Sequence, residues 1–324
     1  MTSLQGSTIV LAGGAGFIGS HIAEQLLAEK PGEMLIVDNL SRGSLANIET
    51  VLRHPNVKFI EGDLRDVALL KRCVDAADYW IHLPAPRIPA CADDTRGAFG
   101  IMVEGLFEFL ELAKHSSIKK ILFPSSVAVY GTATRFPTPE SEPPYANRSF
   151  YGAAKFFGEQ LLRSYHQMHG LPYLVLRNVN TYGPRMDHSG PHAEVVIRWM
   201  DAMERGVSPV IHGDGSTTVD FVHVSDVARA NVLALRSNLQ DDILNIGAGE
   251  EVSLNHLLAL LVHVMGKPTI PDFREGNTIN PVQRRSVDIT KARLLLGYEP
   301  QVTLEEGLRS LYAWYASRAT MAVA

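Results

Sequence analysis

The apolar pattern along the first half of the chain alternates between two periods. Short runs of apolar and β-branched residues, typical of buried parallel strands, are separated by stretches in which apolar residues recur at helical spacing. This regular alternation of strand and helix predicts an α/β fold built on a doubly wound parallel sheet. The predicted strands cover residues 8–12, 34–38, 57–60, 78–83, 119–124 and 174–177.

The apolar pattern changes after about residue 178. The segments become shorter, with one further strand predicted at 243–247 and helices at 254–265 and 304–315. This change predicts a smaller α+β C-terminal lobe beside the sheet. In the first half, the stretch 100–115 carries more apolar surface than one contact with a sheet needs. It is either a buried crossover helix or a helix that also contributes to a dimer face.

A glycine-rich turn connects the first strand to the first helix. Gly13, Gly16 and Gly19 follow one another in G-x-x-G-x-x-G spacing. In a nucleotide-binding turn, the first glycine permits the turn, the second lets the backbone approach a pyrophosphate, and the third lets the helix pack closely. The helix, which begins near Phe17 and Ile18, points its free N–H groups at the phosphates. We therefore expect a Rossmann-type sheet with these five residues at the cofactor.

The second strand ends in an acidic residue about 20 residues beyond the last glycine, as a dinucleotide-binding unit requires. The Asp38 carboxylate can accept both hydroxyls of an adenosine ribose and would repel a 2′-phosphate, which favours NAD over NADP. Alternatively, Asp38 caps a loop. Asn39, Asp63 and Leu64 lie at the same edge of the predicted sheet and are expected beside the adenosine. Asp63 is equally well explained as a helix N-cap.

These boundaries divide the chain into two parts. We expect residues 1–178, together with about 219–246, to form the NAD-binding domain. Residues from about 179 to 218 and from 247 to 314 are assigned to the substrate-binding lobe. Residues 315–324 are expected to be a loose tail.

The fourth and fifth strands end where a nicotinamide and a substrate would meet. Leu83 and Ala85 follow the fourth strand and are expected at the cofactor, and Arg87 is expected at the substrate. Ser126 ends the fifth strand. It is a candidate donor to a substrate oxygen, and the alternative is a strand-end hydroxyl bonded to the backbone.

Tyr151 and Lys155 are four residues apart, so they lie on one face of the helix predicted over 151–169. A tyrosine and a lysine four residues apart often occur by chance. This pair is stronger evidence for a catalytic site because it follows a serine at the end of a predicted strand. A tyrosine is a poor base at its ordinary pKa of about 10, and a nearby lysine favours the phenolate. Tyr151 could then take a proton from a substrate hydroxyl while Ser126 holds the oxygen and Lys155 also holds the nicotinamide ribose.

Composition narrows the possible classes of protein. The chain has 324 residues, 46% of them hydrophobic, and a formal net charge of −5, which gives no basic surface for nucleic acid. It contains no apolar run long enough to cross a bilayer and no signal-peptide pattern, so we expect a cytoplasmic protein without a membrane partner. Its two cysteines form neither a disulfide framework nor a ligand cluster, so no metal is expected.

Taken in order, these motifs resemble those of the extended short-chain dehydrogenase/reductases. Within that group they are similar to the NAD-dependent epimerase/dehydratase family and to nucleotide-sugar 4-epimerases of the UDP-galactose 4-epimerase type. The resemblance spans nearly the whole chain. The matching stretches are 13–20, 37–40, 62–66, 82–83, 125–131, Tyr151 with Lys155, 176–177, Asn180, 182–184, 213–215, 220–221 and 296–298.

The resemblance implies an enzyme that retains NAD and inverts C4 of a UDP-hexose or UDP-hexuronic acid through a transient 4-keto sugar. It places Asn180 and Arg285 near the diphosphate of the substrate. Arg185 could pair with a substrate carboxylate, and the alternative is a surface arginine. The resemblance also implies a homodimer through the helices that begin near residues 100 and 151.

The chain departs from the family pattern at several positions. Related dehydratases and decarboxylases carry an acid just after the catalytic serine or threonine, whereas this chain has Val127 and Ala128. The absence of this acid favours an epimerase over a 4,6-dehydratase. A 4,6-dehydratase, a 4-ketoreductase and a non-catalytic NAD-sensing protein remain the alternatives. Met102 replaces a usual Asn, Val219 a common Arg, and Pro84 a usual Ala.

Overall fold

The computed structural model describes residues 2–188, 193–275 and 284–321. A seven-stranded sheet forms its centre, and all neighbouring strands in this sheet are parallel. The predicted strands are confirmed, with small differences at their ends. In spatial order they are β11 (Asp242–Ile246), β6 (Tyr173–Asn178), β5 (Lys120–Ser126), β4 (Tyr79–His82), β1 (Thr8–Ala12), β2 (Glu33–Asp38) and β3 (Val57–Glu61).

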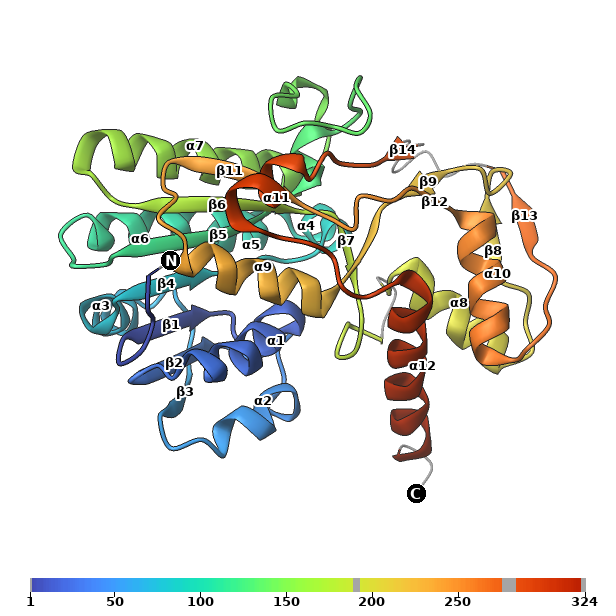
Figure 1. Ribbon diagram of the computed structural model, residues 1–324, viewed down its shortest axis with the longest axis horizontal. Helices are drawn as coiled ribbons and strands as arrows, with labels where there is room; N and C mark the ends of the chain where they lie inside the picture. Colours follow the sequence, from blue (N-terminus) through green and yellow to red (C-terminus); the bar gives the residue numbers. More distant parts are fainter. Residues whose placement is uncertain (1, 189–192, 276–283, 322–324) are drawn as a thin grey trace.

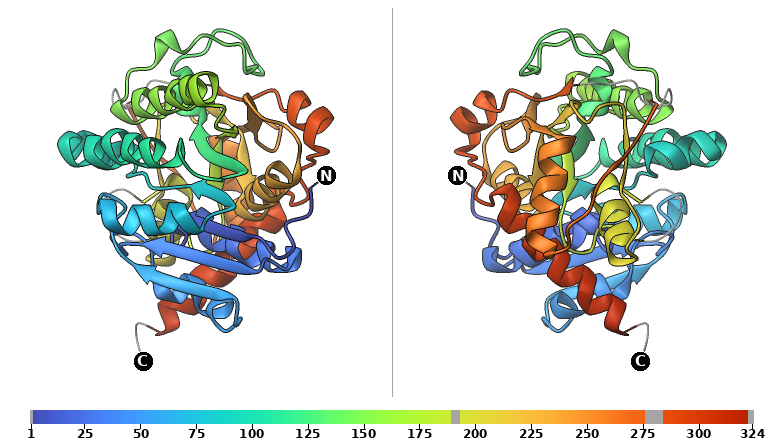
Figure 2. Two further views of the ribbon diagram at one scale, coloured as in Figure 1. Left: turned by 90° about the vertical axis from the view of Figure 1, so that its left-hand side faces the viewer. Right: turned by 90° about the vertical axis from the view of Figure 1, so that its right-hand side faces the viewer.

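Helices cover both faces of the sheet, which confirms the doubly wound Rossmann-type fold. Figure 2 shows the three layers edge-on. One face is covered by α3 (Val67–Ala76), α6 (Gly105–Ala113) and α7 (Phe150–His169). The other is covered by α1 (Phe17–Leu26), α2 (Leu45–Leu52), α9 (Val224–Arg236) and α11 (Thr290–Leu296).

The period-two geometry of a strand explains why these strands are apolar throughout. Along β1, Ile9 and Leu11 pack into the core on the α1 side, whereas Val10 and Ala12 pack into the core on the α6 side. Because successive side chains point to opposite faces, a strand covered on both sides needs apolar residues at every position.

A smaller lobe lies beside the carboxyl ends of the strands (Figure 1). Its own apolar core includes Trp199, Leu257 and Leu311. Its helices are α8 (Val195–Glu204), α10 (Leu254–Met265) and α12 (Leu304–Met321). Its short strands are β8 (Val210–His212) with β13 (Asp272–Arg274), and β9 (Thr218–Val219) with β12 (Val252–Ser253) and β14 (Arg284–Arg285). β7 (Asn180–Tyr182) pairs with β10 (Phe221–His223) between the lobe and the sheet.

Two helix predictions need correction. The stretch 100–115 is not one α-helix, because a π-helical turn over Gly100–Glu104 separates α5 (Thr95–Phe99) from α6. The final helix does not end near residue 315, so residues 315–321 are helical and not a loose tail. Tyr315 still packs against the core of the lobe, and the following residues include good helix formers. Residues 322–324 lie outside the described part of the chain.

The remaining short elements connect these layers. They are η1 (Leu27–Glu29), α4 (Ile88–Asp93), η3 (Val127–Tyr130) and η4 (Pro144–Ala146). Within the described ranges, no helix combines the length and the apolar character needed to cross a membrane.

Candidate active site

The glycine turn has the geometry that the sequence predicts. Gly13 has a φ of +75°, a conformation that favours glycine. A β-carbon at Gly19 would lie 2.7 Å from the Gly13 carbonyl oxygen and 2.7 Å from the Gly14 Cα, so the first turn of α1 packs on the backbone of the loop. A β-carbon at Gly16 would make one tight contact, 3.3 Å from the Gly13 carbonyl oxygen, and would lie within 4 Å of nothing else outside the turn itself. Leu83 also borders the turn.

Asp38 lies at the end of β2, beside this turn. Its carboxylate accepts hydrogen bonds from the backbone N–H of Ala15 at 3.0 Å and of Leu40 at 2.9 Å. Burial raises its pKa above the ordinary value. Asp63 follows the end of the next strand, β3. Its carboxylate accepts a hydrogen bond from the Asn39 side chain at 3.0 Å and also pairs with Arg65. The carboxylates expected at an adenosine are therefore brought together at one edge of the sheet.

Helix α7 is fixed to the two central strands by a buried ion pair. Arg177 on β6 donates through Nε to Glu159 on α7 at 2.9 Å, and both side chains are almost completely buried. Ser125 at the end of β5 donates to the same carboxylate at 2.6 Å. Tyr151, Lys155 and Glu159 are spaced four residues apart, so they lie on one face of α7. The bonds of Glu159 therefore fix how far Tyr151 and Lys155 stand from the strand ends.

Tyr151 lies beside Ser126 at the start of α7. Burial raises the pKa of Tyr151 to about 12, whereas its hydrogen bond with Ser126 and the charge of Arg42 lower it. Lys155 donates from Nζ to the Pro124 carbonyl oxygen at 2.7 Å and lies 5.9 Å from the centre of the Tyr151 ring. Burial lowers the pKa of Lys155 to about 8.

A second cation lies near the tyrosine. Arg42, on the loop after β2, lowers the pKa of Tyr151 by its charge. The Arg42 guanidinium donates to the Ala85 carbonyl oxygen at 3.0 Å, so it is held over the same strand ends. Lys155 is oriented by a backbone oxygen of β5, and its effect on the phenolate stays a prediction.

The side of Tyr151 away from the sheet is apolar. A small buried cluster of Cys91, Ala98, Met102 and Ala154 packs against it. The Cys91 Sγ and the Met102 Sδ lie 4.0 Å apart. Met102, which stands where the family usually has Asn, therefore supplies packing and no polar link to α7.

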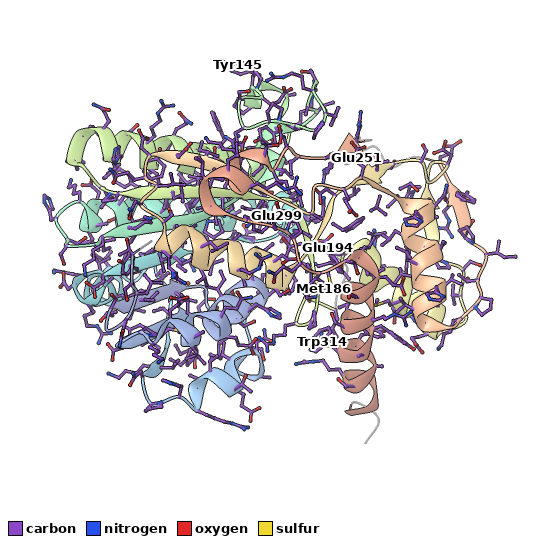
Figure 3. All side chains as sticks on the ribbon, in the orientation of Figure 1. Tyr145, Met186, Glu194, Glu251, Glu299 and Trp314 are labelled. Atoms are coloured by element: carbon purple, nitrogen blue, oxygen red, sulfur yellow. The ribbon has the colours of Figure 1, made fainter. Side chains whose placement is uncertain are left out.

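Charged side chains from both parts of the molecule face one another across the mouth of the site. Arg87, at the start of α4, lies 3.9 Å from Asp187 and 4.0 Å from Glu194. Glu194 also raises the pKa values of Arg42, Arg285 and Tyr151 by its charge. Figure 3 shows Glu194 between the sheet and the lobe. Sequence reasoning missed Arg42, Asp187 and Glu194, because no strand or motif connects them.

The other residues expected at the substrate are placed differently. Arg285 is half-buried on β14 beside Val219, with which it pairs in register. It lines a cleft that also includes Val127 and Ala128, next to Ser126. The Asn180 side chain donates to the Asp220 carbonyl oxygen at 3.4 Å.

Arg185 lies away from these groups. It pairs with Glu24 on α1 and has a φ of +69°. The structure therefore gives Arg185 a role in joining the lobe to α1, and its expected contact with a substrate carboxylate stays a prediction without geometric support. In the described part of the chain, no group of three or more His, Cys, Asp and Glu side chains could hold a metal ion.

One further residue at this edge was not singled out from the sequence. Asn178 is the last residue of β6 and pairs in register with Ser126. Only 6% of its surface is exposed, and its side-chain oxygen accepts no hydrogen bond from the residues that the structure describes. The sequence signal that could have indicated Asn178 is its place as a polar residue at the carboxyl end of the strand next to the one that ends in Ser126.

These features define a dinucleotide-binding protein whose polar groups meet at the carboxyl edge of a Rossmann-type sheet. The model of the NAD dependent epimerase/dehydratase family matches residues 9–247. The chain belongs to this family, and NAD is its cofactor. The residues present fit NAD, because Gly19 lets α1 pack on the glycine turn, the Asp38 carboxylate lies beside that turn, and Asn178 carries an unbonded buried oxygen.

Related proteins narrow the chemistry to nucleotide sugars. The UDP-glucose 4-epimerase of Mycolicibacterium smegmatis is 32% identical over 314 residues, covering 95% of this chain and 98% of the relative. The crystal structure of the UDP-glucose 4-epimerase of Thermotoga maritima with UDP-glucose is 34% identical with a TM-score of 0.89, covering 96% and 99% of the two chains.

Other relatives carry out different reactions on similar substrates. The UDP-glucuronic acid 4-epimerase of Bacillus cereus, solved with UDP-glucuronic acid and NAD, is 27% identical with a TM-score of 0.88 and covers 96% and 99% of the two chains. UDP-glucuronic acid decarboxylase 5 of Arabidopsis thaliana is 32% identical over 305 residues, covering 93% of this chain and 86% of the relative. These relatives share one family but catalyse different reactions. The reaction of an individual member therefore depends on the residues of its active site.

Proposed function

We propose that this protein is an NAD-dependent nucleotide-sugar 4-epimerase that acts on a UDP-hexose or a UDP-hexuronic acid. The observation that carries the proposal is the placement of Ser126, Tyr151 and Lys155 at the strand ends beside the glycine turn, with apolar Val127 and Ala128 next to them. This set can remove and return one hydroxyl proton, but it offers no acid–base pair beside Ser126 for loss of water.

Tyr151 takes the proton of the sugar 4-hydroxyl, and the Ser126 hydroxyl donates to the same oxygen as it becomes a carbonyl. The glycine turn and Asp38 would hold NAD, which would supply a reversible hydride acceptor for C4 of the sugar. The raised pKa of Tyr151 makes its phenolate a strong base toward the 4-hydroxyl. The charge of Arg42 lowers this pKa, and a bound cationic ring would lower it further.

The second candidate is a nucleotide-sugar 4,6-dehydratase, decarboxylase or 4-ketoreductase. Two observations favour considering it, namely the decarboxylase relative and the presence of Arg285 in the same cleft as Val127. The two apolar side chains after Ser126 argue against it, because abstraction of a proton at C5 needs a base at that point of the site. A non-catalytic NAD-sensing role is less well supported, because the complete proton-transfer set would then have no use.

Proton NMR tests these alternatives directly. The purified protein is incubated separately with UDP-glucose, UDP-N-acetylglucosamine and UDP-glucuronic acid, without added reductant. We expect new anomeric signals of the C4 epimer from at least one of the three. A 4-keto-6-deoxy product or a pentose product would contradict the proposal in favour of the second candidate.

The Tyr151→Phe variant tests the assigned base. Because the phenol oxygen carries the proton transfer, kcat should fall by about a hundredfold or more while NAD affinity stays unchanged. Tyr145→Phe is the matched control, because Tyr145 is 92% exposed on a loop (Figure 3) and should keep full activity. Retained turnover in Tyr151→Phe would remove Tyr151 from this role.

We also propose a homodimer through α6 and α7. Phe107 and Phe157 are 43% and 44% exposed on these adjacent helices, as in a surface that a second copy covers. Light scattering should give twice the mass of the chain, and Phe107→Asp with Phe157→Asp should give the monomer. A monomeric mass for the unchanged protein would contradict this proposal. A cytoplasmic location stays a prediction of the sequence.

A further inference from the structure

The unbonded oxygen of Asn178 is the starting point for a further assignment. Burying an amide oxygen without a donor costs roughly 1–3 kcal/mol, so such groups are rare unless a ligand or ordered water completes them. Asn178 is 6% exposed, and its Oδ1 has no partner in the described part of the chain. A donor from a ligand or from an ordered water would satisfy this oxygen, and its place at the carboxyl edge of the sheet makes a ligand the relevant source.

The order of the strands indicates which group that is. Asp38 lies at the end of β2 and the glycine turn follows β1, whereas Ser126 and Asn178 end the neighbouring strands β5 and β6. A dinucleotide that begins with its adenosine at β2 and passes its pyrophosphate over β1 reaches β5 and β6 with its far end. That far end is the nicotinamide and its carboxamide, which carries an NH₂ donor.

We propose that the Asn178 side-chain oxygen accepts a hydrogen bond from the carboxamide NH₂ of NAD and so fixes which way the nicotinamide ring is turned at the Ser126–Tyr151 pair. The contact rests on the NAD dependence of the family and does not depend on which sugar nucleotide reacts. Asn178 is thus a positioning residue, because it acts through the orientation of the ring and leaves proton transfer to Tyr151.

The rigidity of the surroundings supports this role. Asn178 directly follows Arg177, which is held by the buried Glu159, and Ser126 directly follows Ser125, which binds the same carboxylate. The two strand ends that carry Asn178 and Ser126 are therefore fixed relative to α7. A ring held by Asn178 would keep a constant position relative to Tyr151.

A cofactor analogue gives a readout that is independent of turnover. In 3-acetylpyridine adenine dinucleotide a methyl group replaces the carboxamide NH₂, so the donor is removed and the rest of the cofactor is kept. Equilibrium binding of NAD and of the analogue is measured by calorimetry on the cofactor-depleted full-length protein. The unchanged protein should bind NAD about tenfold more tightly than the analogue, the effect expected of one hydrogen bond to a buried acceptor.

Asn178→Leu removes the acceptor at nearly constant volume. It should bind NAD and the analogue within about twofold of each other, because neither finds an acceptor. Asn231→Leu is the matched control, because Asn231 is also buried with an unbonded Oδ1 but lies within α9, away from the strand ends. The control should keep the tenfold preference.

Other results would overturn the assignment. If Asn178→Leu keeps the tenfold preference, another group holds the carboxamide. If it keeps the preference and loses affinity for UDP-sugars, the amide serves the substrate. If the leucine variant does not fold, Asn178→Asp replaces it, because a carboxylate still accepts from the NH₂ and should keep the preference. Loss of the preference in that variant would count against the proposal.

Discussion

The sheet edge and the mouth of the site hold their functional groups by different means. At the edge, Ser126, Tyr151 and Lys155 are fixed by backbone contacts and by the buried pair of Glu159 and Arg177. At the mouth, Arg87 meets Asp187 and Glu194 at about 4 Å through long side chains, and more than half of the Glu194 side chain is exposed.

This difference suits the sheet edge to proton transfer and the mouth of the site to substrate binding. Proton transfer needs atoms held to within a fraction of an ångström, which buried bonds provide. Binding a diphosphate needs cations that can exchange one anionic partner for another, which ion pairs with partly exposed carboxylates permit at low cost. Changes at the edge should therefore affect folding and turnover strongly, whereas changes at the mouth should affect affinity modestly.

The largest effect is expected at the buried pair. Glu159→Leu leaves the Arg177 charge buried without its partner, so the free energy of unfolding should fall by about 3–5 kcal/mol in urea denaturation. Glu49→Leu is the control, because the Glu49–Arg53 pair is exposed, and its effect should stay within about 0.5 kcal/mol. Equal effects in the two variants would mean that the anchor of α7 lies elsewhere.

A middle-sized effect is expected at the glycine turn, where two substitutions separate folding from cofactor binding. Gly19→Ala places a methyl 2.7 Å from backbone atoms, so it should lower stability by about 1–3 kcal/mol and weaken NAD binding. Gly16→Ala meets only the Gly13 oxygen, at 3.3 Å, so it should lower the melting temperature without cofactor less than Gly19→Ala does and still lose NAD affinity. If Gly16→Ala leaves NAD affinity unchanged, the pyrophosphate does not approach this turn.

The smallest effect is expected at the mouth. Glu194→Gln removes one carboxylate that competes with the substrate diphosphate for Arg87. Affinity for UDP should rise about two- to fivefold at low salt, and the gain should fade as salt screens the exposed charges. Glu204→Gln, on the same helix, should show no such change because Glu204 pairs with Lys267. Weaker UDP binding in Glu194→Gln would instead make Glu194 a ligand of the substrate.

The sequence predicted the parts of the molecule that depend on neighbours in the chain. The strands of the sheet, the glycine turn and the shared helix face of Tyr151 and Lys155 all follow from spacing. The strand ends then gather at one edge because the sheet is parallel. Local pattern and geometry of the sheet together were sufficient for these features.

The remaining features depend on side chains that meet from distant segments. The approach of Arg87 to Asp187 and Glu194 depends on how the lobe packs on the sheet, which no local pattern encodes. The influence of Arg42 on Tyr151 depends on the path of the loop after β2. The π-helical turn at Gly100 and the extension of α12 to Met321 likewise result from packing that spacing alone does not reveal.

The contact between α1 and the lobe has a consequence for movement. His21 donates to the Pro184 carbonyl oxygen at 2.9 Å, and Arg185 pairs with Glu24 one turn further along α1. Two side-chain bonds hold this side of the interface, whereas the loop near Thr132 and β14 line the cleft. A rotation of the lobe about these bonds would widen the entrance for a sugar nucleotide. We expect such a rotation to exchange the substrate at every cycle while the dinucleotide is retained.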